Sequence, residues 1–157
     1  MGEVEAASRI ATDRTADSTS LTAKAEEPRR ITLLLVDDQR IVGAAVSRLL
    51  ASETDIRVHW CDNAAAAVSR ANQIKPTIIF QDLFMPDIDG LTLVERFRGN
   101  ATTAHTPVIV LSADDDTKTR MRAFAAGASD YLLKLPAKQD LIACIRRHAA
   151  TPSRSEG

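Results

Sequence analysis

The chain has 157 residues, of which 45% are hydrophobic, with a net charge of −1 and a pI near 6.3. This length and apolar content predict one domain with one buried core, and the nearly balanced charge gives no electrostatic footprint for nucleic acid. No apolar stretch reaches transmembrane length, and the amino terminus lacks the apolar segment of a signal peptide. We therefore expect a soluble, cytoplasmic protein that binds neither nucleic acid nor a membrane.

Residues 1–30 are rich in Ala, Ser, Thr, Glu and Arg, which predicts a disordered amino-terminal tail. Residues 31–150 alternate between strand and helix patterns and predict a single domain. We expect strands at 31–36, 56–60, 77–81, 107–111 and 130–134. We expect helices at 40–51, 63–73, 91–99, 116–127 and 137–149. Residues 151–157 predict a disordered tail or a linker stub.

Three local features support these boundaries. Asn63 is a suitable N-cap for the second helix. Pro76 should end that helix, because the residue before a proline disfavours the helical conformation. Gly127 stands where the fourth helix needs a left-handed C-cap. The alternation predicts an α/β flavodoxin-like fold, a doubly wound five-stranded parallel sheet in the order 2-1-3-4-5 with helices on both faces.

The cysteines and histidines give no sign of a metal centre in the sequence. Cys61 and Cys144 lie far apart and have no CxxC partner, so we expect two free buried thiols. His59, His105 and His148 are scattered without metal-ligand spacing. We interpret all three as structural or surface histidines.

Three acids are expected at one edge of the sheet. Asp82 follows the apolar run 77–81, and Asp37 and Asp38 follow strand 31–36. Open parallel α/β sheets bind ligands at the carboxyl ends of their strands. Three grouped carboxylates repel one another unless a cation lies between them, and oxygen ligands alone favour a hard ion such as Mg²⁺ or Mn²⁺.

A hydroxyl and a lysine are expected at the same edge. Ser112 follows strand 107–111, and Lys134 ends strand 130–134. An Asp beside a metal ion can act as a nucleophile and form an aspartyl phosphate, whose oxygens the lysine and the hydroxyl would stabilise. Each residue alone is a weak indication, because an Asp pair often caps a helix and a lone Lys or Ser often lies on the surface. Their joint placement predicts a site that accepts a phosphoryl group.

These motifs resemble the CheY-like receiver domain of bacterial two-component response regulators. The resemblance covers about residues 31 to 150 and rests on Val36–Gln39, Gln81–Gly90, Leu111–Ala113 and Ala126–Lys134. Residues 71–77 and 134–136 further resemble the receivers of Wsp-type diguanylate cyclase regulators.

The resemblance implies that Asp82 is the phosphoacceptor, charged by a sensor histidine kinase or a histidine phosphotransfer protein. It implies that Mg²⁺ is held by Asp37, Asp38 and Asp82 together with the backbone carbonyl of Phe84. The protein would then act in a phosphorelay and would turn over no external substrate, so it would not be an enzyme in the usual sense.

The resemblance also implies a switch. Lys134 would bind the phosphate, Ser112 would be the switch hydroxyl, and Tyr131 would be the aromatic residue that rotates inward on phosphorylation. The face formed by the fourth helix, the fifth strand and the fifth helix would then bind a downstream protein or a second copy of the chain.

The sequence departs from the family pattern at three places. Leu135 separates Lys134 from Pro136, which excludes a Lys-Pro bond and leaves the isomer of the Leu-Pro bond open. Phe84 is bulky where many relatives carry a small or polar residue, so we expect slow hydrolysis of the aspartyl phosphate. Residues 114–116 are three aspartates, and we favour a solvated loop and helix N-terminus over an additional acidic site.

Alternative outputs remain open at this point. The chain could be the receiver portion of a diguanylate cyclase regulator that lacks its GGDEF domain, or a docking module that works without phosphate. A haloacid-dehalogenase-like phosphohydrolase would need a second Asp two residues after the nucleophile, where this sequence has Phe84. We set that alternative aside.

Overall fold

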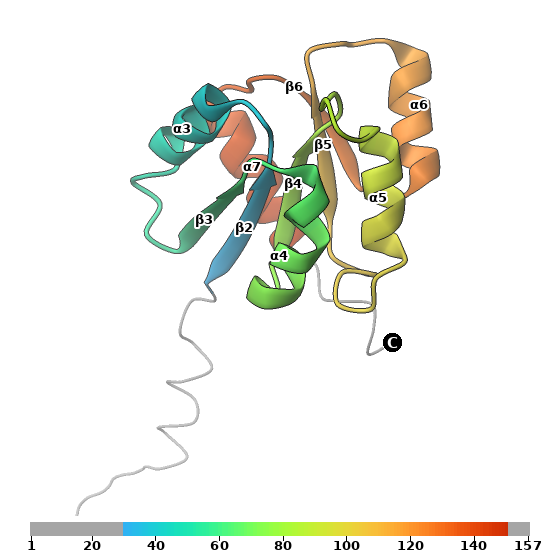
Figure 1. Cartoon of the computed structure of the whole chain (residues 1–157). Helices are drawn as coiled ribbons and strands as arrows, with labels where there is room; N and C mark the ends of the chain where they lie inside the picture. Colours follow the sequence, from blue (N-terminus) through green and yellow to red (C-terminus); the bar gives the residue numbers. More distant parts are fainter. Residues whose placement is uncertain (1–29, 151–157) are drawn as a thin grey trace, which may run out of the picture.

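A computed structural model describes residues 30–150, so the two predicted tails lie outside the described residues apart from Arg30. Five parallel strands form one sheet in the order β3-β2-β4-β5-β6 (Figure 1). The strands are β2 (Ile31–Val36), β3 (Ile56–Cys61), β4 (Ile78–Asp82), β5 (Val108–Ser112) and β6 (Asp130–Leu133). The α-helices are α3 (Arg40–Leu49), α4 (Ala67–Ile74), α5 (Gly90–Arg98), α6 (Thr117–Ala126) and α7 (Lys138–Ala149). This is the predicted flavodoxin-like fold with the order 2-1-3-4-5.

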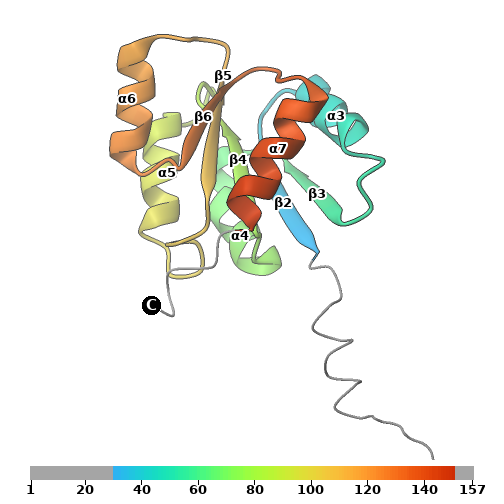
Figure 2. The ribbon, with the colours of Figure 1, turned by 180° about the vertical axis from the view of Figure 1, so that it is seen from behind.

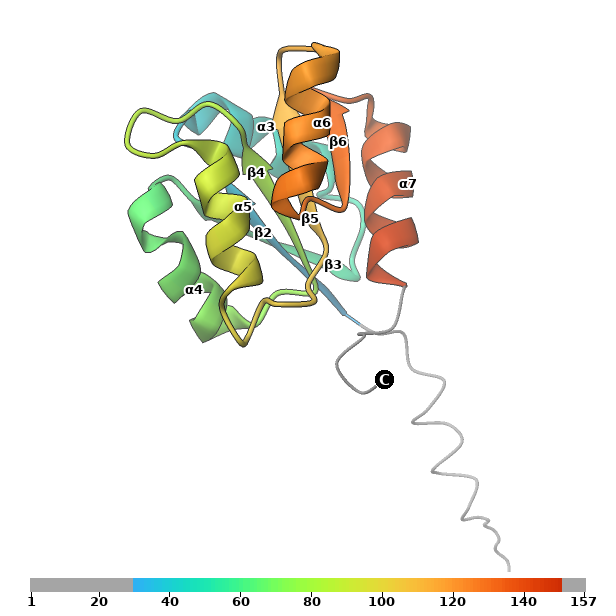
Figure 3. The same ribbon diagram turned by 90° about the vertical axis from the view of Figure 1, so that its right-hand side faces the viewer.

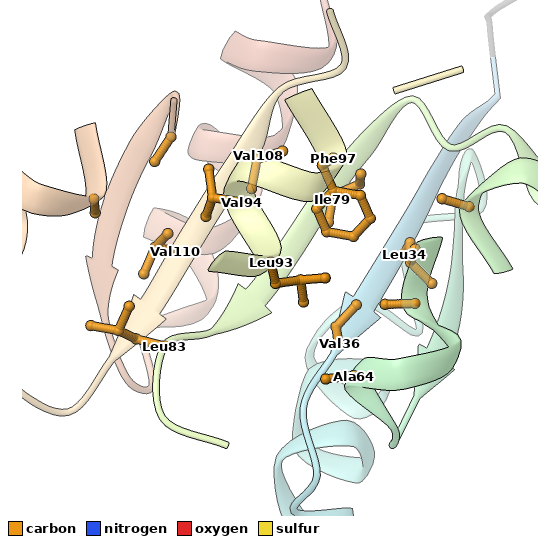
Figure 4. Packing of buried hydrophobic residues seen from close by; sticks show 14 of the residues in the cluster. Leu34, Val36, Ala64, Ile79, Leu83, Leu93, Val94, Phe97, Val108 and Val110 are labelled. Atoms are coloured by element: carbon orange, nitrogen blue, oxygen red, sulfur yellow. The ribbon is translucent and has the colours of Figure 1, made fainter. Parts of the chain in front are cut away.

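Helices cover both faces of the sheet. Helices α4, α5 and α6 lie on the face seen in Figure 1, and α3 and α7 lie on the face seen from behind in Figure 2. Successive strand residues point to opposite faces. In β4, Ile79 therefore packs in the core under α4, α5 and α6, whereas Ile78 and Phe80 pack in the core under α3 and α7. Figure 4 shows the first core, where Leu93 and Phe97 of α5 lie over the sheet.

Most predicted boundaries hold within two residues, but the start of the second helix differs. Asn63 caps a short 3-10 helix, η1 (Ala64–Ala66), and accepts a hydrogen bond from the Ala65 amide at 2.8 Å; α4 begins only at Ala67. The helix ends at the predicted place, with Lys75 left-handed (φ 49°) before Pro76. Gly127 takes the predicted left-handed C-cap of α6 (φ 118°).

The sheet brings together the strand ends that the sequence predicted to be functional. The β4 ladder extends through Asp82, which pairs with Leu111, and the β5 ladder extends through Ser112, which pairs with Leu133. Both side chains are therefore held by strand backbone rather than by a loop. Within residues 30–150, no helix has the length and apolar character needed to cross a membrane.

Candidate functional site

The carboxylates of Asp37, Asp38 and Asp82 meet at the carboxyl ends of β2 and β4; we call them the acidic cluster. Their nearest oxygens all lie within 4.8 Å of one another. The pairing of Val36 with Gln81 in adjacent parallel strands places Asp37 beside Asp82. Asp37 and Asp82 are buried, and Asp38 is exposed. The predicted grouping of the three acids is confirmed.

Lys134 reaches into the acidic cluster from two strands away. Its Nζ lies 3.0 Å from Asp37 Oδ2 and 3.1 Å from Asp82 Oδ1. Its backbone N–H donates to the Ser112 carbonyl at 2.9 Å, which fixes the lysine at the end of β6. Burial alone would lower the pKa of Lys134, but the two paired carboxylates outweigh burial and raise it. The lysine is therefore a fixed positive charge.

The electrostatics of the acidic cluster favour a cation. Burial and then repulsion by Asp37 raise the pKa of Asp82, and Lys134 and the Phe84 amide only partly oppose this. Asp37 Oδ1 accepts from the Gln39 amide at 2.8 Å, whereas its buried Oδ2 has ion-pair contact with Lys134 but no hydrogen-bond donor among the described residues. Buried carboxylate oxygens that repel one another and lack hydrogen-bond donors suit a hard divalent ion. The residues present thus fit Mg²⁺.

A chain of two hydrogen bonds leads from this edge to β6. Ser112 Oγ accepts from the Asp114 amide at 3.0 Å, and the Asp114 carbonyl accepts from the Tyr131 hydroxyl at 2.5 Å. The Tyr131 ring is buried, and the Arg120 guanidinium lies 4.7 Å from its centre. The aromatic ring thus already lies in the inward position that the sequence analysis expected only after phosphorylation.

The loop after Asp82 carries Phe84, one of the three departures from the family pattern. The Phe84 amide donates to Asp82 Oδ1 at 3.3 Å, and the Phe84 side chain is 60% exposed. A groove of about 540 Å³ is lined by Leu83–Asp89 and includes none of the acidic cluster. Phe84 thus contacts Asp82 through its backbone amide, whereas its bulky ring lies at the surface.

The other two departures are also resolved. The peptide bond between Lys134 and Leu135 is cis, whereas the bond between Leu135 and Pro136 is not. The aspartates at 114–116 are exposed; Asp116 caps α6 through the Thr119 amide at 3.0 Å. The favoured interpretation, a solvated loop and helix N-terminus, is confirmed.

Two residues beside the acidic cluster were missed. Gln81 is buried, and its Nε2 donates to the Gly90 carbonyl at 2.9 Å, which ties β4 to the start of α5. Trp60 Nε1 donates to the Asp37 carbonyl at 2.8 Å. A glutamine within an otherwise apolar strand was a usable indication for Gln81. Nothing local indicated Trp60, because its partner lies 23 residues away.

The thiols are free and buried, as predicted. The three histidines are scattered in the sequence, but the fold brings one of them, His148, into a group of possible metal ligands. His148 Nε2 lies 3.0 Å from Asp130 Oδ2, and Cys144 lies beside the same carboxylate oxygen. The sequence spacing hid this grouping because Asp130 comes from a different element.

The site geometry agrees with the comparison with known families. The model of the response regulator receiver domain matches residues 33–146. The chain belongs to this family. It is thus a CheY-like receiver of the kind used in two-component signalling, and the resemblance seen in the sequence is confirmed at that level. The finer likeness to Wsp-type regulators is not shown.

Similar proteins place the receiver in larger chains. The transcriptional regulatory protein TrcR of Mycobacterium tuberculosis is 30% identical over 117 residues, covering 74% of this chain and 44% of TrcR. Response regulator Rre1 of Synechocystis is 30% identical over 116 residues, covering 74% and 50%. This chain spans about half the length of these two relatives, or less.

Solved structures agree on the fold. The BeF3-activated receiver domain of Klebsiella pneumoniae RstA is 27% identical with a TM-score of 0.70, covering 76% of this chain and 99% of that one. The receiver domain of the sensor histidine kinase PA1611 of Pseudomonas aeruginosa is 24% identical with a TM-score of 0.71, covering 78% and 99%. That second protein holds a magnesium ion in its active site cleft.

Proposed function

We propose that this receiver accepts a phosphoryl group on Asp82 from the phosphohistidine of a sensor histidine kinase or a histidine phosphotransfer protein. In this step the phosphorus–nitrogen bond breaks, and a bond forms between phosphorus and a carboxylate oxygen of Asp82. The observation that carries the proposal is the buried Asp82 carboxylate beside Asp37, with Lys134 Nζ within 3.1 Å of both. Lys134 would balance charge on the phosphoryl oxygens, and the Ser112 hydroxyl would donate a hydrogen bond to one of them.

The proposed metal site consists of Asp37, Asp38, Asp82 and the backbone carbonyl of Phe84. Bound Mg²⁺ would neutralise charge that develops on the phosphoryl oxygens. The buried Asp37 Oδ2, which pairs with Lys134 but accepts no hydrogen bond from the described residues, and the oxygen-only ligand set support this assignment, as does the magnesium in the PA1611 receiver. Asp37 and Asp38 would hold the ion, so that Asp82 stays ionised and able to attack.

The proposed switch uses the two hydrogen bonds that meet at Asp114. Ser112 Oγ already accepts from the Asp114 amide, and a hydroxyl can donate to a phosphoryl oxygen at the same time. A shift of Ser112 toward the phosphate would move the backbone of Asp114 through its N–H, and the Asp114 carbonyl accepts the hydrogen bond of the Tyr131 hydroxyl. This would change the surface formed by α6, β6 and α7, the equivalent of the face named in the sequence analysis.

That surface has the character of a protein-binding face. It exposes large apolar side chains, and a groove of about 490 Å³ lies between α6, β6 and α7. The exposed apolar residues are Met121, Phe124, Leu133 and Leu135. A downstream protein or a second receiver would bind there. The likeness of residues 71–77 and 134–136 to Wsp-type receivers makes cyclic-dinucleotide synthesis one output to test. The predicted cytoplasmic location and the two tails remain predictions.

Intact mass after incubation with acetyl phosphate and Mg²⁺ tests the proposal. The native chain should gain one phosphoryl group, Asp82→Asn should gain none, and the exposed loop variant Asp87→Asn should behave as the native chain. Chelation of Mg²⁺ should abolish the gain. No gain in the native chain, with no fluorescence response of Trp60 to Mg²⁺, would instead favour a docking module that works without phosphate.

A second experiment tests the role of Phe84. The aspartyl phosphate of the native chain should hydrolyse slowly, and Phe84→Asn should hydrolyse faster because a smaller polar side chain admits water. Equal hydrolysis rates in the two proteins would contradict this role while leaving Asp82 as the acceptor.

A further inference from the structure

A second group of metal-ligating side chains lies away from the acidic cluster. Asp130, Cys144 and His148 each offer one ligand atom, and these atoms all lie within 4.8 Å of one another. We call this group the β6–α7 cluster. Cys144 and His148 are four residues apart, so they share one face of α7. Asp130 begins β6, and Figure 3 shows this strand beside α7.

We propose that the β6–α7 cluster binds a divalent zinc-type ion, Zn²⁺ or Co²⁺, through Asp130 Oδ2, Cys144 Sγ and His148 Nε2. Bonds of roughly 2.0–2.3 Å at tetrahedral angles hold such ligand atoms roughly 3.3–3.6 Å apart. Here the His148 nitrogen lies 3.0 Å, and the Cys144 sulfur 4.0 Å, from Asp130 Oδ2. These two separations lie on either side of the range that the ion requires, and the His148 nitrogen and Cys144 sulfur lie within 4.8 Å of each other. Water would be the fourth ligand.

The surroundings support a site with mixed ligands. The other Asp130 oxygen, Oδ1, accepts from the Tyr131 amide at 2.8 Å, and this contact orients the carboxylate as outer hydrogen bonds do at metal centres. A thiolate, a carboxylate and a neutral imidazole balance the charge of a divalent ion. Cys144 also lines the groove between α6, β6 and α7, which gives the ion a path from solvent.

One contact competes with the ion. Arg147 Nη2 lies 2.7 Å from Asp130 Oδ2, the oxygen that would bind the metal. The Arg147 side chain is 63% exposed, so it can withdraw toward solvent when the ion enters. Removal of Arg147 should therefore tighten metal binding. If Asp130, Arg147 and His148 formed only a structural ion-pair network, removal of Arg147 would not change the affinity for a metal ion.

The two cation sites can be measured separately. Asp130 and Lys134 stand at opposite ends of β6, about 13 Å apart along the strand. The acidic cluster offers only oxygen, whereas the β6–α7 cluster offers sulfur. Absorption from charge transfer between a thiolate and Co²⁺ therefore reports on the second site alone.

The experiment is a Co²⁺ titration of the reduced, metal-free full chain in excess Mg²⁺, followed by displacement with Zn²⁺. We expect a near-ultraviolet charge-transfer band that saturates at one equivalent and is bleached by Zn²⁺. Cys144→Ser should abolish the band, and Cys61→Ser should retain it. His148→Gln should weaken Co²⁺ binding at least about tenfold, and Arg147→Gln should tighten it about two- to fivefold.

Several results would overturn the proposal. They are the absence of a band in the native chain, a band that survives Cys144→Ser, and an affinity that Arg147→Gln leaves unchanged. Co²⁺ binding that excess Mg²⁺ abolishes would place the ion in the acidic cluster instead. Circular dichroism and the Mg²⁺ response of Trp60 show whether each variant is folded, so that a lost band is assigned to the lost ligand.

Discussion

Arg98 is a partly buried side chain that joins three segments of the chain, and its removal tests how the site is supported. Its Nε donates to the Gly127 carbonyl at 2.8 Å, and its Nη1 donates to the Thr106 carbonyl at 2.6 Å. Its Nη2 donates to Ser129 Oγ at 3.2 Å. Burial lowers the pKa of Arg98. The guanidinium thereby joins α5 to the segments that lead into β5 and β6, the strands that position Ser112 and Lys134.

The cost of Arg98→Ala follows from these contacts. A hydrogen bond to a charged group contributes about 1.5–3 kcal/mol, and a carbonyl left without a donor costs more when water cannot reach it. Counting only the two shortest bonds at the low end of that range, we expect the free energy of unfolding to fall by about 3–4 kcal/mol. That loss is a large share of the roughly 5–15 kcal/mol typical of a domain.

Urea denaturation followed by the fluorescence of Trp60, the single tryptophan, measures this loss. The exposed neighbour Arg96 is the matched control, and Arg96→Ala should change stability by less than about 0.5 kcal/mol. Arg98→Lys keeps the charge but loses the planar fork, so it should recover only part of the loss. Equal stability of the Arg98→Ala and Arg96→Ala proteins would refute this role of Arg98.

Three further predictions follow from individual contacts. Lys134→Met should increase Mg²⁺ affinity, because a competing cation leaves the acidic cluster, while phosphoryl uptake from acetyl phosphate should fall about 100-fold; unchanged uptake would contradict its role. Gly90→Ala places a Cβ in steric overlap with the Leu83 carbonyl oxygen and should lower the free energy of unfolding in urea by about 2–3 kcal/mol, whereas Gly99→Ala, with its nearest atom at 3.5 Å, should cost far less. Burial, then Arg70 and Arg57, lower the pKa of His59 below 6.5, so stability should fall as pH drops below 6.5, where the unfolded chain takes up the proton first. An NMR titration midpoint below 6.5 that rises in Arg70→Gln supports this, and a midpoint at or above 6.5 opposes it.

The fold could be predicted from the sequence because the patterns that indicate strands and helix ends are local. Alternating and continuous apolar runs mark the strands, and Gly127 and Pro76 mark helix ends through their own backbone preferences. The four strand ends that carry the acidic cluster, Ser112 and Lys134 follow from parallel topology alone. The 3-10 turn after Asn63 was missed because an alanine run has high helix propensity in either form.

What the sequence did not reveal depends on contacts between distant segments. In the sequence of α5, Arg98 resembles Arg96. Only the approach of the segment before β5 and the turn before β6 covers it in part and gives it hydrogen-bond partners. The same reason hid the pairing of Trp60 with the Asp37 backbone and the grouping of Asp130 with Cys144. Such contacts become visible only in the folded structure, because the sequence around one residue does not indicate which distant residue it will contact.

The position of Tyr131 changes where the switch must act. If the ring rotated from solvent into the core, the ring itself would carry the signal, but here it is buried and hydrogen-bonded to the Asp114 carbonyl. The preceding peptide group is bound as well, since the Asp114 amide N–H donates to Ser112 Oγ. A displacement of Ser112 by a phosphoryl group would therefore act on the segment between β5 and α6, which contains Asp114 and ends at the Asp116 cap of α6. Because Arg120 of α6 packs on the Tyr131 ring, movement of this helix relative to β6 is the expected route by which phosphorylation changes the surface that a partner meets.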